Sequence, residues 1–160
     1  MTLEAEPATR GTGRPAGPAR IVRLLAVILM AAGAVLLVSG VATWFTVQNQ
    51  LGDERVTVAD DAARYAGQPV DGPLTAYEQA KIIEKHALES SGGKTYAELD
   101  REDPKRATVM NGSFLRASLF TSVVSFGVAA MAAGLGVLVI VIGYALMMVA
   151  RQLAALQPQA

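Results

Sequence analysis

Two long uncharged apolar stretches bracket a charged middle segment. No Asp, Glu, Lys, Arg or His occurs in residues 24–52 or in residues 117–150. A hydrocarbon layer about 30 Å thick needs about 20 helical residues, and both stretches are longer than this. The pattern predicts an all-α membrane protein, in which an antiparallel two-helix transmembrane hairpin carries a small, mainly helical extracytoplasmic cap between its spans.

The first apolar stretch predicts a transmembrane helix over residues 21–46. Before it, residues 1–20 are rich in Gly, Pro, Ala and Arg, a composition that cannot bury a core and that predicts a disordered cytoplasmic tail. The alternative is a cleaved signal peptide, because Gly40 and Ala42 fit the small positions before a cleavage site. The apolar run is long for such a peptide, so we favour a retained span.

The second apolar stretch predicts one long helix. No proline occurs between Pro104 and Pro158, and residues 117–150 alone would measure about 51 Å at 1.5 Å per residue. The helix is predicted to start at residue 104, and the excess over the hydrocarbon thickness predicts that its first turns stand above the membrane. Its transmembrane part is predicted over about residues 126–148, and residues 151–160 form a cytoplasmic tail. The sequence favours a break, if any, at Asn111 and Gly112.

The charged middle, residues 47–116, is predicted to be an extracytoplasmic region. Alternation over residues 54–60 indicates a strand or a short extended arm. A helix is predicted over residues 75–90, with Thr75 as its N-cap and Glu78 completing a capping box.

A second capping pattern follows the glycine pair at residues 92 and 93, which should end the first helix. Thr95 and Glu98 repeat the spacing and predict a short helix over residues 96–103. Asp103 before Pro104 then resembles an N-cap followed by a proline in the first helical position.

Positive charge indicates the orientation. The amino-terminal 23 residues contain four arginines against two glutamates, and Arg151 follows the second span. Both termini are therefore predicted to be cytoplasmic, in a two-span protein of the plasma membrane. The predicted anchors at the membrane interfaces are Arg20, Arg23, Trp44, Phe45, Arg116, Tyr144 and Arg151.

Small residues recur every seven positions on both spans. Helices in lipid associate through close van der Waals contact, for which small residues are needed, and a seven-residue spacing keeps them on one stripe. We expect the two stripes to form the helix-packing interface: Ala26, Gly33 and Gly40 on the first span, and Ala129, Gly136 and Gly143 on the second. Other small pairs, such as Ala130 with Gly134, offer a face for another chain.

The residue types argue against most chemistry. The chain has no cysteine and one histidine, His86, whereas hydrolytic or oxygen-activating metal sites usually combine two or three His with a carboxylate. Residues 92–95 match the end of a phosphate loop, but Leu88 stands where its first glycine is needed. We therefore expect no catalytic, cofactor or metal site, and no nucleic acid as a partner because the charge balance is even.

Three segments carry a family resemblance: residues 72–77 (GPLTAY), 86–100 (HALESSGGKTYAELD) and 113–127 (SFLRASLFTSVVSFG). Together they resemble a family of small two-span actinobacterial membrane proteins often labelled aromatic ring-opening dioxygenase, over about residues 20–150. The resemblance implies a cell-envelope protein. The label implies an extradiol enzyme whose non-haem iron is held by two His and a carboxylate, and with a single histidine no site residue carries over.

These observations favour a non-catalytic integral membrane protein, an accessory or scaffolding subunit whose partners are the lipid bilayer and other membrane subunits or further copies of itself. One alternative is a subunit of an aromatic ring-opening dioxygenase whose metal ligands lie on another chain. Another is a homo-oligomeric channel, although ion paths usually contain ionisable groups within the spans.

Overall fold

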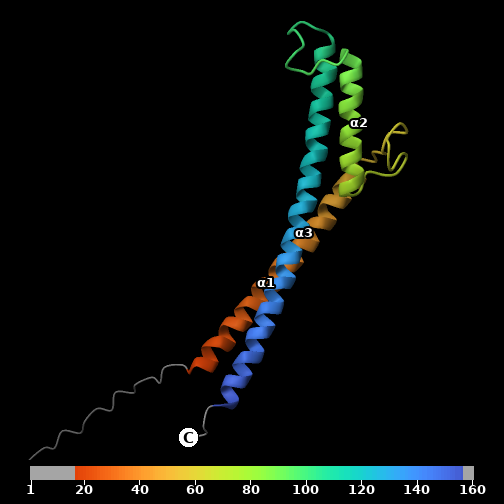
Figure 1. Ribbon diagram of the computed structural model, residues 1–160. Coiled ribbons are helices and arrows are strands. Elements are labelled where there is room, and N and C mark those ends of the chain that lie inside the picture. The colour runs from red at the N-terminus through yellow and green to blue at the C-terminus, as the bar shows by residue number, and fades with distance from the viewer. Residues whose placement is uncertain (1–16, 157–160) are drawn as a thin grey trace, which may run out of the picture.

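The computed structural model describes residues 17–156, which form three helices: α1 (Pro18–Asp53), α2 (Pro73–Ser91) and α3 (Lys105–Ala155). Helix α3 runs the length of the molecule, and both other helices pack against it (Figure 1). Helix α1 lies along its carboxyl-terminal half and α2 along its amino-terminal half. The ends of the two predicted tails, residues 1–16 and 157–160, lie outside the described residues.

Helix α1 is longer than predicted at both ends. It begins at Pro18, whose fixed φ suits the first helical turn, so the last residues of the predicted tail are helical. It also continues past residue 46 to Asp53. Val47 and Leu51 in this extension are partly buried and lie with α3 residues around one groove, so the two helices stay together beyond the apolar stretch.

Helix α3 is continuous, as the absence of proline predicts. Its 51 residues make it roughly 75 Å long at 1.5 Å per residue. It begins within one residue of the predicted start, where the Asp103 carboxylate accepts a hydrogen bond of 2.8 Å from the Lys105 N–H. The helix does not break at Gly112. That residue lets α2 approach instead, because a Cβ there would lie 3.0 Å from the Cβ of Ala87.

The predicted start of α2 at Thr75 is wrong by one half-turn. Pro73 occupies the first turn and Gly72 is the N-cap. Thr75 still satisfies the helix end, because its Oγ1 accepts a 3.2 Å hydrogen bond from the Gly72 N–H. Glu78 forms no capping box and is paired with Lys81 at 3.4 Å. The predicted end is confirmed: Gly92, with φ of +72°, follows Ser91 in the left-handed conformation that favours glycine.

The predicted short helix over residues 96–103 is wrong, because this segment forms only turns. Its cap interaction does form, with the Glu98 carboxylate accepting from the N–H of Thr95 at 2.8 Å. One capped turn does not offset the cost of nucleating a helix. The segment is instead held by Leu99, which is buried and whose carbonyl accepts a hydrogen bond from Arg106.

The segment between α1 and α2, residues 54–72, forms neither the predicted strand nor an extended chain: it is a loop of turns and bends that folds back on itself, and we call it the arm. A single bridge pairs Thr57 with Pro69, and the Val58 N–H donates to the Gln68 carbonyl at 2.9 Å. Val58 and Val70 are buried with Ala76 of α2 in a small cluster. Partly buried residues of α1 and α3 surround this cluster (Leu51, Leu119 and Val123), so the arm is packed where the three helices meet.

Candidate functional site

The contact between α1 and α3 is made by small residues at every seventh position. All six predicted interface residues are buried: Ala26, Gly33, Gly40, Ala129, Gly136 and Gly143. A Cβ built on Gly33 would meet the Gly136 carbonyl oxygen at 2.7 Å, and one built on Gly40 would meet the Ala129 carbonyl oxygen at 2.6 Å. The two stripes therefore face each other in antiparallel register.

The backbones touch directly at the centre of this contact. A Cβ on Gly136 would lie 2.5 Å from the Leu37 nitrogen and 2.9 Å from the Leu37 Cα. Ordinary Cβ contacts lie at 3.4–4 Å, so only glycine fits between these helices as they stand. Contact at this range supplies the dispersion energy that holds helices together where lipid is as apolar as the side chains.

Both stripes extend one step further than the sequence prediction. Ala19 and Ala150 are buried as well, at the next seven-residue position of each helix. Ala150 closes the apolar stretch, and Ala19 lies in the predicted tail. The spacing alone predicts Ala150, and it would also have predicted Ala19 if the first helix had been predicted to start at Pro18.

The second small-residue face is open. Ala130 and Gly134 are exposed, and a Cβ on Gly134 would meet nothing within 4 Å. In the described part of the chain this face of α3 therefore has no partner helix.

The aromatic residues predicted as interface anchors differ in their surroundings. The Trp44 ring packs edge-on against Phe126, with ring centroids 4.7 Å apart. Phe126 is only 1% exposed, so this pair belongs to the α1–α3 contact. Phe45 and Tyr144 are exposed and lie on the outer surface of their helices.

The arginines predicted as anchors fall into two places. Arg20 and Arg23 of α1 line a groove with Arg151 of α3, at the end of the molecule where α1 begins. Arg116 lies in the other half, within the contact of α3 with α2: it forms an ion pair of 2.9 Å with Glu84 and lies over the Phe120 ring. Its ion pair thus links α3 to α2.

A polar groove lies between the carboxyl-terminal part of α1 and the facing part of α3. It has a volume of about 480 Å³, and the residues that line it include four hydroxyl side chains: Ser118, Thr121, Ser122 and Ser125. The hydroxyls of Thr121, Ser122 and Ser125 each donate to the carbonyl four residues earlier. These three donors are therefore satisfied within α3.

Asp61 attaches the arm to α2. One of its carboxylate oxygens, Oδ2, lies 2.8 Å from Lys85 Nζ and 3.0 Å from His86 Nε2. Hydrogen bonds from Lys85 and then from His86 lower the pKa of Asp61 from 3.8 to about 2. The same contact raises the pKa of Lys85. The single histidine thus helps to hold Asp61 against α2.

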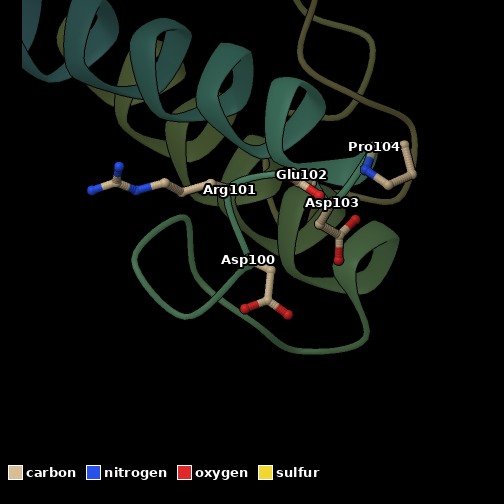
Figure 2. A pocket seen from close by; sticks show the side chains of 5 residues that line it. All are labelled: Asp100, Arg101, Glu102, Asp103 and Pro104. Carbon is tan, nitrogen blue, oxygen red and sulfur yellow. The ribbon is translucent and has the colours of Figure 1, made fainter.

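An acidic hollow of about 600 Å³ precedes α3, lined by residues 100–104 (Figure 2). The carboxylates of Asp100 and Asp103 do not converge on a common point, and Arg101 extends away from both. Within residues 17–156 no three His, Cys, Asp or Glu side chains gather as metal ligands do. The hollow thus consists of solvated turn residues.

The described structure is all-helical and contains two helices, α1 and α3, that are long and apolar enough to cross a membrane. No family model, curated protein or solved structure matches the chain. The resemblance to the actinobacterial family therefore stays a prediction.

Proposed function

We propose that the chain is an integral protein of the plasma membrane that serves as a non-catalytic accessory or scaffolding subunit. In this proposal α1 and α3 cross the membrane as an antiparallel hairpin with both termini cytoplasmic. Helix α2, the arm and the turns before α3 form the extracytoplasmic cap.

The observation that carries membrane insertion is the exposure of the apolar surface. Only 11% of the most apolar 18-residue stretch of each long helix is buried in the protein. The core helix of a soluble protein would be mostly buried. Leucine, isoleucine and valine side chains are exposed on both helices, with Leu24, Val38, Leu138 and Val141 between 54% and 66% accessible. An apolar surface of this extent requires lipid or partner helices to cover it.

Two features support the scaffolding role: the small core of the cap and an open face of small residues on α3. The cap has a very small core of its own, and its cluster around Val58 is completed by residues of α1 and α3. A cap of this kind depends on the long helices for its packing. The open face at Ala130 and Gly134 fits a helix of another subunit, because small residues permit close approach in lipid.

Insertion and orientation are tested by cysteine labelling, since the natural chain has no cysteine. Single cysteines replace Ala97 in the cap and Gln159 near the carboxyl terminus, and intact cells are treated with a membrane-impermeant maleimide. We expect Ala97→Cys to be labelled from outside and Gln159→Cys only after permeabilisation. The reverse pattern, or release of the protein by alkaline carbonate, would contradict the proposal.

The subunit role is tested by gentle detergent extraction and mass spectrometry of what co-purifies. A stable complex with other membrane proteins supports the scaffolding role. Co-purifying iron with ring-cleavage activity would instead favour an oxygenase subunit, and a pure homo-oligomer would favour a channel.

A further inference from the structure

A groove of about 320 Å³ lies where α1 begins and α3 ends. Three arginines line it, although they come from distant parts of the chain: Arg20 and Arg23 from the first turns of α1, and Arg151 from the last turns of α3. The positive-inside rule accounts for arginines near this end, but it does not require that they share one groove.

The charge at this groove is uncompensated within the described residues. The ion pairs found in residues 17–156 all lie in the cap, and none involves these three arginines. The first turn of α1 contains no acidic residue. The half-charges of the α1 amino end and the α3 carboxyl end have opposite signs and largely cancel, so the three guanidinium groups set a strongly positive potential.

The floor of the groove is apolar. Ala19 and Ala150 are buried between the helices, and Met147 lines the groove on the side of the apolar stretch. Beyond it, exposed side chains such as Leu24 and Met148 continue the apolar surface along both helices. A ligand that fills this groove therefore has an anionic head and a hydrocarbon tail.

We propose that this groove binds the phosphate headgroup of an anionic phospholipid, with an acyl chain lying along Met147. Guanidinium groups bind phosphate oxygens through paired, charge-assisted hydrogen bonds, and basic pockets between transmembrane helices on the cytoplasmic side bind such headgroups. The proposal rests on the membrane insertion proposed above. The apolar floor favours lipid over free phosphate.

The test uses the full chain reconstituted with equal amounts of phosphatidylglycerol and phosphatidylcholine, followed by native mass spectrometry. We expect the wild type to retain one phosphatidylglycerol in preference to phosphatidylcholine. Each of Arg23→Gln and Arg151→Gln should lower that preference about fivefold, as expected for the loss of one basic residue near an anionic surface. Arg151→Lys keeps the charge without the planar fork and should fall between Arg151→Gln and the wild type.

Arg101→Gln is the matched control, because Arg101 is exposed at the opposite end of the molecule and lines the acidic hollow. It should leave the preference unchanged. Equal loss in Arg101→Gln, equal retention of both lipids by the wild type, or displacement of the lipid by millimolar inorganic phosphate would each overturn the proposal. Circular dichroism and resistance to alkaline carbonate are measured on every sample. A protein that resists extraction but shows no lipid preference refutes only the headgroup site, whereas extraction of the wild type refutes membrane insertion itself.

Discussion

Replacing Gly136 with alanine tests the α1–α3 contact most directly. The added Cβ would lie 2.5 Å from the Leu37 nitrogen and 2.7 Å from the Gly33 carbonyl oxygen. Both neighbours are backbone atoms of a regular helix, so neither can move aside as a flexible side chain would. The helices themselves must separate to restore an ordinary distance of 3.4 Å or more, which is an opening of about 1 Å.

The size of the effect follows from this opening. A gap of 0.5–1 Å removes roughly a quarter to a half of the dispersion energy of each facing atom pair. Overpacking of a well-packed contact typically costs about 1–3 kcal/mol, and we expect Gly136→Ala to weaken helix association by that amount. Both helices remain helical after they separate in a micelle, since their backbone hydrogen bonds are internal. The usual gain in helix propensity from glycine to alanine therefore cancels.

Trp44, the only tryptophan, is the natural reporter for this measurement, because it packs against Phe126 across the contact. The protein in dodecyl maltoside is titrated with sodium dodecyl sulfate while tryptophan emission is followed. Far-ultraviolet circular dichroism confirms that the separated helices persist. The transition of Gly136→Ala should come at a lower detergent fraction than that of the wild type.

A graded series makes the reasoning refutable. Gly40→Ala should match Gly136→Ala, because its Cβ would also meet backbone atoms, at 2.6 Å. Gly143→Ala should be milder, since its nearest neighbour is the flexible Met30 side chain at 2.7 Å. Gly134→Ala is the control, with nothing within 4 Å, and should change the transition by less than about 0.5 kcal/mol. If Gly134→Ala weakened association as much as Gly136→Ala, the assigned interface would be wrong.

Three further predictions concern other contacts. Pairing lowers the pKa of Asp61 from 3.8 to about 2, so the attachment of the arm to α2 is fully present above about pH 4 and is lost as the pH falls towards 2. Asp61→Asn should remove the attachment at pH 7, which is measured as faster amide hydrogen exchange in residues 54–72. Unchanged exchange would contradict this. Gly92→Ala should lower the free energy of unfolding by about 1–2 kcal/mol, because Gly92 has φ of +72° and an L-residue is strained there. An unchanged thermal unfolding transition would show that another conformation ends α2. Phe126→Leu keeps an apolar side chain but removes the ring pair with Trp44. It should weaken the α1–α3 contact by about 0.5–1.5 kcal/mol and shift the Trp44 fluorescence emission. An unaltered emission spectrum would exclude the pairing.

Periodicity and length were the features that the sequence predicted well. The continuous α3 follows from the absence of proline over more than 50 residues, and the end of α2 follows from the glycine pair at residues 92 and 93. The seven-residue spacing of small residues placed Gly33 and Gly136 on faces that the structure brings together. These signals are local or strictly periodic, so they can be recognised in a single sequence.

Tertiary contacts decided the features that the sequence missed. Thr95 and Glu98 form the predicted cap interaction, yet the helix after them does not form because the segment is tied down by Leu99 and Arg106. Arg116 resembles a membrane anchor in the sequence, and only the fold shows Glu84 of α2 beside it. The groove shared by Arg23 and Arg151 could likewise be found only from the tertiary structure, because no sequence spacing relates residues so far apart.

Helix α3 connects α2 and the arm to α1. Within the described residues α1 and α2 both pack on α3 and not on each other. A change in the packing of α1 would therefore reach α2 through α3. The cluster at Val58 adds a second link, since it includes Leu51 of α1 as well as Leu119 of α3. A separation of the helices at Gly136 would therefore shift Leu51 relative to Leu119 and loosen the base of the cap. Hydrogen exchange at Val58 in the Gly136→Ala variant should rise accordingly, and unchanged exchange there would show that the cap and the hairpin are stable independently.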